Sequence, residues 1–462
     1  MQKKCRLLAA AQQKVREMEP GRIARLFHEL FTLPPNFEQG FRKRIFIPVN
    51  TFVLFLYQVL VKDCSCAGVM QYLSSFFATQ ARKPPSLNTA SYCAARLRLC
   101  FEKIKEILRT NTLRAQEEIS KEQLWCGRRV KVADGTGCKL PDTKENQADY
   151  PQPKSQKKGC GNPVIRIVVL FCLATGMILE WATGSLNVSE TELFRSMLDA
   201  LKARDVFVAD RGFGGFVMFH LILQRGADFV VRIKERSRKR LKVLRKISKN
   251  ERIVIWYRPK IRPAWLAEDV WKTVPETLKL REISYQIDAP GFRTSRVVVI
   301  TNLMDRQDYP AASFKDLYKL RWRAELHLRE IKTTMGMEQL TCKTPEMIKK
   351  EILMHFIGYN LIRATMQKAA SLHGVPIERI SFKASVNLFV IFCFFLELLS
   401  DVLDKGNLMN LLYSLVAQCK VPERPNRREP RTVKQRMKPY PLMTSERSEF
   451  QEVPHRGKRP NS

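Results

Sequence analysis

The 462-residue sequence has no apolar run long enough to cross a membrane and no segment typical of a secretory signal. Its longest apolar run, Leu388 to Leu396, is far shorter than the roughly 20 residues that a spanning helix needs, and it indicates a buried helix. The N-terminus turns polar after five apolar residues, which is fewer than the roughly 7–15 of a signal-peptide core. We therefore expect a cytoplasmic protein that does not span a membrane.

The sequence also lacks paired cysteine and histidine motifs. Its twelve cysteines are scattered, and the one close pair, Cys64 and Cys66, has no matching Cys-x-x-Cys or His-x-His partner. The six histidines show no ligand spacing either. We therefore expect free thiols, with neither a disulfide framework nor a zinc site.

Acidic residues are few, because 45 Asp and Glu stand against 80 Lys and Arg and leave a formal charge of +35. Since 45% of the residues are hydrophobic, the charge belongs to a folded protein and not to a disordered basic chain. A folded body with this charge attracts polyanions. Nucleic acid is the most common of these, and an acidic membrane surface is the alternative.

The apolar pattern divides the chain into four regions and one insertion. Helical spacing dominates residues 1–125 and returns over 346–420, whereas short alternating runs typical of strands mark 126–345. A basic stretch followed by three tryptophans interrupts this central region at about 234–293. Seven prolines and an excess of Lys and Arg over Glu predict a basic, proline-rich tail over 421–462.

The order of elements in the central region favours an α/β fold with a ribonuclease H-like core. An edge or half-buried strand at 128–135 precedes a hairpin, a helix capped by Ser189, a buried parallel strand, and a further helix and strand. We therefore expect a mixed five-stranded sheet with flanking helices, interrupted by a β-rich insertion and joined to helical N- and C-terminal regions. The remaining expected ranges are 164–174 and 177–183 for the hairpin, then 205–210, 216–224, 228–233, 296–301 and a long helix over 314–334.

Two aspartates occupy similar positions at the expected ends of strands. Asp134 follows Val132-Ala133, Asp210 follows Val208-Ala209, and both precede glycine-bearing backbone. An aspartate at a strand end is commonly a turn or capping residue. If the two strands are adjacent in one sheet, however, the carboxylates lie close enough to share a hard cation, which prefers oxygen ligands.

The long helix can present a polar stripe beside an apolar one. At about 100° per residue, Tyr318, Arg321, Glu325 and Lys332 fall within about 60° of one another. Leucine, alanine and isoleucine positions form a separate stripe that can be buried. The simpler alternative is a solvated face on which Arg321 and Glu325 form an ordinary i,i+4 pair.

These four residues, in this spacing and behind the two aspartates, resemble the Tyr-Arg-Glu-Lys signature of the DDE transposases of insertion-sequence family 4. The segments around Asp134 and Asp210 are similar to the first and second aspartate motifs of that family. Residues 86–99 resemble its N-terminal domain, and residues 428–442 resemble its basic C-terminal arm. The resemblance covers most of the chain.

The resemblance implies a DNA transposase with a catalytic triad of Asp134, Asp210 and Glu325 that holds two Mg²⁺ ions, for which Mn²⁺ can substitute. It also implies that Arg321 and Lys332 hold phosphates beside the scissile bond and that Tyr318 contacts the same backbone. The implied reaction is cut-and-paste transposition of an insertion sequence by hydrolysis and transesterification at its ends.

The partners implied are double-stranded DNA, both terminal inverted repeats and target DNA, and a second copy of the chain in a synaptic complex. The resemblance places residues 1–125 at the DNA ends, the C-terminal helices in dimerisation, and the protein at the nucleoid. It implies no membrane partner.

The basic run from Lys234 to Arg252 holds ten Lys and Arg residues. Such a dense excess of charge repels itself unless an anion neutralises it, so we expect contact with the DNA backbone. A solvated face is the simpler alternative. Arg211 lies in a glycine-rich segment beside Asp210 that lacks full phosphate-loop spacing. The expected DNA contacts from these segments are Arg211, Lys234, Arg236, Arg238, Lys239 and Arg240.

One property of the family is left open by the sequence. Relatives form a DNA hairpin and stack a flipped base on a tryptophan, whose position here falls near Val297. Trp256, Trp265 and Trp271 could take that role, since stacking needs only an aromatic face, but core packing is the favoured interpretation for each. A catalytically inactive, transposon-derived DNA-binding protein is the alternative function, because bulk charge needs no triad.

Overall fold

The computed structural model describes residues 45–423, except 80, 156, 158, 287–295 and 400–404, together with 33, 34, 37 and 449. The first part of the expected N-terminal region and most of the tail at 421–462 therefore lie outside the described residues. None of the described helices is both long and apolar enough to span a membrane. All the cysteines that the structure describes are free thiols, as expected.

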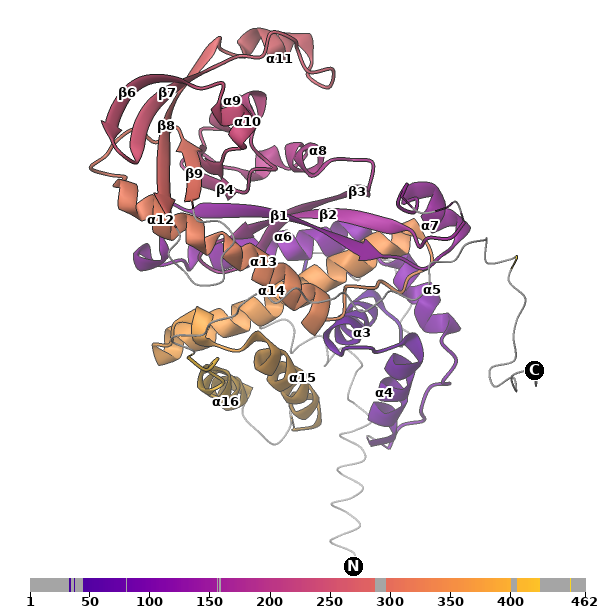
Figure 1. Ribbon diagram of the computed structural model, residues 1–462. Coiled ribbons are helices and arrows are strands. Elements are labelled where there is room, and N and C mark those ends of the chain that lie inside the picture. The colour runs from indigo at the N-terminus through magenta and orange to yellow at the C-terminus, as the bar shows by residue number, and fades with distance from the viewer. Residues whose placement is uncertain are drawn as a thin grey trace, which may run out of the picture.

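One mixed sheet of nine strands runs through the protein (Figure 1). The strands are β1 (Val130–Lys139), β2 (Val164–Cys172), β3 (Ile178–Ser185), β4 (Val206–Ala209), β5 (Asp228–Arg232), β6 (Lys242–Ser248), β7 (Glu251–Tyr257), β8 (Thr277–Gln286) and β9 (Arg296–Thr301). Their order is β3-β2-β1-β4-β5-β9-β8-β7-β6. β4 pairs in parallel with β1 and with β5, and every other neighbouring pair is antiparallel.

The mixed α/β class is confirmed, but the expected size of the sheet is wrong. The strands of the insertion, β6 to β8, do not form a separate unit, because β8 pairs with β9 and so extends the central sheet. β1 is also not an edge strand. It lies between β2 and β4, and its first four residues are buried because helices cover both faces of the sheet there.

Helices pack on both faces of the sheet, as Figure 1 shows. On one face, β1, β4 and β5 contribute Ala133, Phe207 and Phe229 to a core with α8 and α9. On the other face, Val132, Val208 and Val230 pack in a larger core with α6 and α12 to α14. These elements are α6 (Phe101–Glu117), α8 (Glu190–Arg195), α9 (Phe216–Leu223), α12 (Ala311–Leu320), α13 (Trp322–Arg329) and α14 (Pro345–His373). The expected cap of α8 is present, since the Ser189 side chain accepts from the backbone N–H of Glu192.

The long helix expected over 314–334 is interrupted twice. α12 ends at Leu320, α13 begins at Trp322, and Glu330–Thr334 form a π-helical turn. In that turn the N–H of Met335 donates to the carbonyl of Glu330 at 3.1 Å, five residues back. The extra residue per turn rotates Lys332 away from the position that a regular helix would give it.

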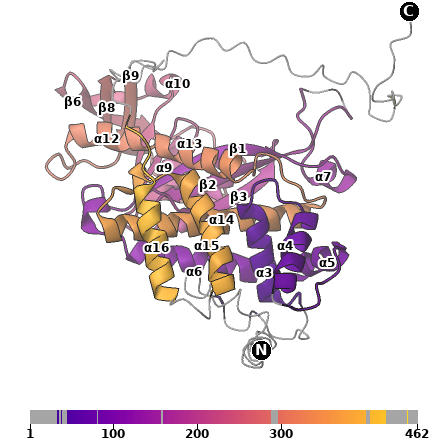
Figure 2. The same cartoon turned by 90° about the horizontal axis from the view of Figure 1, so that it is seen from below.

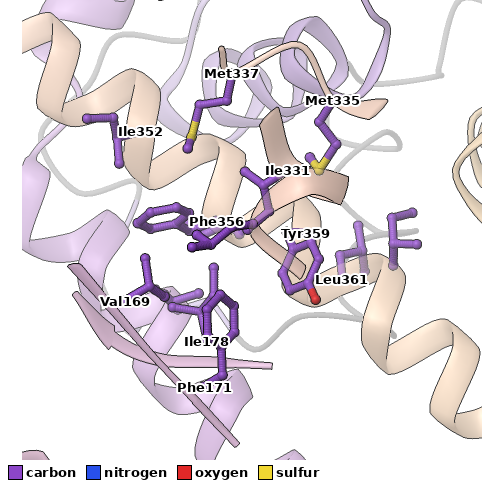
Figure 3. Packing of buried hydrophobic residues seen from close by; sticks show 14 of the residues in the cluster. Val169, Phe171, Ile178, Ile331, Met335, Met337, Ile352, Phe356, Tyr359 and Leu361 are labelled. Atoms are coloured by element: carbon purple, nitrogen blue, oxygen red, sulfur yellow. The ribbon is translucent and has the colours of Figure 1, made fainter. Parts of the chain in front are cut away.

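The buried centre of the molecule lies between the sheet and α14. Figure 3 shows Val169 and Phe171 of β2 and Ile178 of β3 facing side chains of α14, with the π-helical turn packed above them. The labelled residues from α14 and the turn region are Ile331, Met335, Met337, Ile352, Phe356, Tyr359 and Leu361. The turn that carries Lys332 is thus anchored in the largest core.

The N- and C-terminal helices form a layer beyond α14 (Figure 2). α3 approaches α14 closely at Gly358, where an added Cβ would lie 3.3 Å from Leu56 and from Leu60. The remaining helices are α3 (Pro48–Leu60), α4 (Cys66–Thr79), α5 (Ala90–Arg98), α7 (Lys144–Asp149), α10 (Glu235–Arg238), α11 (Glu268–Thr273), α15 (Phe382–Leu399) and α16 (Lys405–Gln418). α15 contains the longest apolar run of the sequence and is a helix, as expected.

Candidate active site

Asp134 and Asp210 lie at the same level on two neighbouring strands. β1 and β4 are parallel, with Val132 opposite Val208, so the two aspartates follow two residues later on each strand. Because side chains alternate between faces, both carboxylates are on the face that α13 covers. The expectation that Asp134 lies at a strand end is wrong, because pairing with β2 extends β1 to Lys139.

Backbone N–H groups hold one oxygen of each aspartate. The N–H of Gly135 donates to Oδ1 of Asp134 at 3.0 Å, and the N–H of Gly212 donates to Oδ1 of Asp210 at 2.7 Å. The loop after Asp210 is tied to α8 by the Thr191 hydroxyl, which donates to the Gly212 carbonyl at 3.0 Å. Both carboxylates are therefore positioned by main-chain geometry.

Glu325 reaches the same place from α13, which packs against β1. Arg321 Nη2 donates to Glu325 Oε1 at 2.8 Å, and the Arg321 side chain is only 11% exposed. Burial raises the pKa of Asp134 to about 6, the nearby Arg321 opposes the rise, and the charges on Glu325 and Asp210 add to it. Arg321, Glu325 and Asp210 thus all lie within electrostatic reach of Asp134.

A pocket of about 300 Å³ opens beside Asp134 and Glu325. Lys332 lies at its edge, where its ammonium donates to the Gly137 carbonyl of β1 at 3.0 Å. Asp210 is not among the lining residues. The pocket is lined by Asp134, Gly135, Thr136, Glu325, Leu328, Arg329, Lys332, Thr333 and Glu338.

Tyr318 is buried beside Arg321, whose guanidinium carbon lies 5.7 Å from the centre of the phenol ring. It is 9% exposed, and burial raises its pKa to about 12 against the influence of Arg321 and Arg232, with Asp210 adding to the rise. The phenol therefore stays protonated at neutral pH and keeps a hydrogen to donate.

Arg329 and Glu338 line the pocket although the sequence analysis did not select them. Arg329 falls at about 20° on the helical projection used above, so the same periodicity could have found it. Glu338 has no local sequence signal. It is brought to the pocket by a parallel bridge between Lys139 of β1 and Gln339, which pairs segments 200 residues apart.

The expected DNA contacts separate into two groups. Arg211, Lys234, Arg236, Lys239 and Arg240 are exposed. Arg238 instead donates to the carboxylate of Glu282, which is 3% exposed and also binds Arg252. The charge of Arg238 is therefore balanced by a buried carboxylate within the protein.

Trp256 and Trp265 of the insertion also differ from each other. Trp256 is 9% exposed and packs edge-on against Phe216 and Phe219, so it is a core residue. Trp265 is 45% exposed, contrary to the favoured core interpretation, and the guanidinium of Arg195 lies 3.9 Å from its ring centre.

The site is suited to divalent cations in the type of its donors. Asp134, Asp210 and Glu325 supply only carboxylate oxygens, and the pKa of Asp134 is raised mainly by burial and further by the charges of the other two, both of which a bound cation would offset. Within the part of the chain that the structure describes, no three Asp, Glu, His or Cys side chains are close enough to hold one ion. The triad therefore stays a prediction.

The chain is similar to known transposases in sequence and in structure. Residues 125–361 match the family model of the transposase DDE domain. The transposase InsG for insertion sequence element IS4 of Escherichia coli (strain K12) is 26% identical over 364 residues, which are 77% of this chain and 79% of that protein. A cryo-EM structure of the piggyBac transposase synaptic complex with hairpin DNA is similar at a TM-score of 0.41 and 12% identity, over 87% of this chain and 82% of that one.

The matched region includes the strands that carry both aspartates and the helices that carry the Tyr-Arg-Glu-Lys residues. DDE transposases cleave DNA and transfer strands with the help of divalent metal ions. Since the family model matches more than half of the chain, the resemblance inferred from the sequence is confirmed, and the chain belongs to the DDE transposases.

Proposed function

We propose that this transposase moves an insertion sequence by a cut-and-paste reaction in which Asp134, Asp210 and Glu325 hold two Mg²⁺ ions, with Mn²⁺ able to substitute. The observation that carries the proposal is the electrostatic interaction of Asp134, on β1, with the carboxylates of Asp210, at the end of β4, and Glu325, on α13, in a chain of net charge +35. The run of strands β3-β2-β1-β4-β5 with helices on both faces supports a ribonuclease H-like core.

The carboxylates prepare the site for hard cations. Asp134, with a pKa of about 6, is ionised at neutral pH, and its fixed Oδ1 leaves the other oxygen for a ligand. When bound, the metal ions stabilise charge on the attacking and leaving oxygens of the phosphodiester. The half-buried setting strengthens that interaction, because water screens it less than at the surface.

Arg321, Tyr318 and Lys332 are placed to hold the DNA backbone. The buried Nε of Arg321 has no hydrogen-bond partner in the described structure, while its Nη2 is bound to Glu325. Arginine suits phosphate oxygens because its donors lie in one plane and can bind two oxygens at once. Tyr318 keeps its proton, and Lys332 is a point charge at the edge of the pocket.

The wider path of the DNA follows the exposed cations. Arg211 lies next to Asp210, and Lys234, Arg236, Lys239 and Arg240 extend the positive surface into the insertion. We assign the terminal inverted repeats to residues 1–125, target DNA to the catalytic face, and synapsis to a homodimer formed through the C-terminal helices at 346–420. The tail at 421–462 is a further basic arm, and the nucleoid is the expected site of action.

Cleavage of supercoiled DNA that carries the terminal repeats, with Mg²⁺ present, tests this assignment. Glu325→Gln and Asp210→Asn should bind DNA normally and fail to cut it, whereas Asp316→Asn on the exposed side of α12 should cut like the parent. Cutting by both triad variants at the parental rate would refute the assignment. A protein that only binds DNA would show salt-sensitive binding and no strand transfer with any metal.

A matched pair of glycine variants tests the role of Asp210 without changing a carboxylate. In Gly212→Ala the new Cβ would lie 2.9 Å from Oδ1 of Asp210, so the carboxylate must turn away, and cleavage should fall about 100-fold. In Gly215→Ala nothing lies within 4 Å of the new Cβ, and activity should persist. Equal activities would show that the position of Asp210 does not matter.

A further inference from the structure

The segment Tyr257–Trp265, which joins β7 to α11, exposes apolar side chains between cations. Tyr257 is 50% exposed, Ile261 is 83% exposed and Trp265 is 45% exposed. Arg258, Lys260 and Arg262 alternate with them, and the sequence has no acidic residue from Ile253 to Ala267. Single exposed apolar residues are ordinary, but this alternation with cations on one projecting loop favours a ligand that is both apolar and anionic.

The loop is held in its projecting form by its own ends. Arg258 donates to the Val274 carbonyl at 2.8 Å, and its guanidinium lies 4.7 Å from the centre of the Trp271 ring. At the other end, Arg262 donates to the carbonyl of Leu266, whose side chain is buried. Prolines at 259 and 263 restrict the backbone between these anchors. Ile261 is therefore presented to solvent by a stiff support.

A short helix connects this loop with the catalytic strand. The Trp265 ring lies under the guanidinium of Arg195, the last residue of α8. The first residue of α8, Glu190, lies so close to Gly135 that an added Cβ there would be 2.5 Å from its carboxylate. Six residues of helix span about 9 Å. The two ends of α8, one beside the loop and one beside β1, are therefore separated by less than one DNA turn of roughly 34 Å. Figure 1 shows α11 and α8 on the same side of the sheet, opposite to the side that α13 covers, so DNA that contacts both the loop and Asp134 must pass the edge of the sheet.

We propose that the loop at 257–265 is a DNA wedge, in which Ile261 enters between base pairs from the minor groove while Lys260 and Arg262 contact the flanking phosphates. An apolar wedge that unstacks one base step bends the duplex and increases the contact between protein and DNA. The inference rests on the proposed seating of DNA at Asp134. The alternating cations favour DNA over an apolar protein partner, because a protein groove would leave three charges to desolvate.

Bending of a 40-base-pair duplex with one central TA step and a fluorophore at each end tests the wedge, with full-length protein. The parent should shorten the end-to-end distance. Ile261→Ala should bind about tenfold more weakly, lose the bend, and keep the same salt dependence, because no phosphate contact is removed. Asp316→Asn, which changes an exposed side chain on α12, should behave like the parent.

Lys260→Ala gives the complementary result. It should lower the slope of log K against log salt by about 0.9 and leave the bend in place. Parental bending and affinity in Ile261→Ala would overturn the wedge. So would an effect of that variant confined to oligomeric mass in light scattering or to binding of anionic vesicles.

The wedge and the active site can fail independently. Glu325→Gln should bend the duplex as the parent does. If that variant still cuts DNA, the proposed triad is wrong while the bending result stands.

Discussion

The side chain of Asp134 is held in a setting that disfavours its charge. Burial is the main cause of its raised pKa of about 6, and the two other carboxylates add to it. A protein that needed this residue only for stability would gain from replacing it. Keeping an ionisable group here makes sense if a cation or another ligand compensates the charge during function.

Asp134→Asn should therefore alter the dependence of stability on pH in the metal-free protein. The folded-state pKa of about 6 exceeds the ordinary value of 3.8, so the stability that the protonated carboxyl provides is lost as the pH rises through about 6. The melting temperature of the variant should rise relative to the parent between pH 4.5 and 7.5. The corresponding gain in the free energy of unfolding should be about 1 kcal/mol. This is less than the full pKa shift implies, because the side chain is only half-buried.

Thermal melts of both proteins in EDTA across this pH range measure the difference. A constant difference in melting temperature at every pH would contradict the assignment of the raised pKa to Asp134.

At the scale of elements, a buried ion pair within the insertion is hydrogen-bonded to the segment that precedes α12. Arg281 of β8 is fully buried and donates to Glu251 of β7 at 2.7 Å and to the Tyr309 carbonyl, just before α12, at 2.7 Å. Its guanidinium also lies 5.3 Å from the centre of the Phe314 ring in α12. The pair thus fixes the start of the helix pair that carries Tyr318 and Glu325.

Glu251→Ala should leave this guanidinium buried without its carboxylate and lower the free energy of unfolding by about 3–5 kcal/mol. Urea denaturation checks the value, with Asp316→Ala as the control, because that aspartate forms only an exposed pair with Lys319. The double variant Glu251→Leu with Arg281→Met should recover most of the loss. A loss below about 1 kcal/mol in Glu251→Ala would show that the pair is not a structural link.

The elements that the sequence predicted best are those marked by local pattern. The hairpin of β2 and β3, the cap at Ser189 and the buried strand β4 follow from apolar runs and capping residues close to one another in the chain. The extension of β1 past Asp134 depends on β2, and the π-helical turn depends on packing of Ile331 and Met335 in the core. Neither leaves a local signal, so both were missed.

At the scale of the whole molecule, the basic residues behind the charge of +35 fall into two groups with different partners. Part of it is balanced inside the fold, as Arg238 and Arg252 are by Glu282, and part is exposed around the proposed DNA path. The sequence predicted the basic run of the insertion but could not divide it, because Glu282 lies about 40 residues away and meets Arg238 only through the fold.

This division predicts different results for neighbouring arginines and lysines. The triple variant Arg236→Ala, Lys239→Ala, Arg240→Ala should lower the slope of log K against log salt by about 2–3 for nonspecific duplex DNA, without changing the melting temperature. Arg238→Ala should lower the melting temperature, because it leaves Glu282 with fewer partners. Fluorescence anisotropy titrations at several salt concentrations, with thermal melts, separate the two. Identical behaviour of all four positions would show that the run acts only as bulk charge.

The pairing of β9 has a consequence for any shortened form of this protein. β9 bonds to β5 on one side and to β8 on the other, so the insertion covers what would otherwise be the border of the central sheet. A chain without residues 234–286 would leave the backbone N–H and C=O groups of Val297 to Ile300 unpaired on one side, as an open edge that can add a strand from another molecule. The insertion thus also protects β9 from pairing with another molecule. A shortened insertion that keeps β8 would retain this protection, whereas one that lacks β8 would lose it.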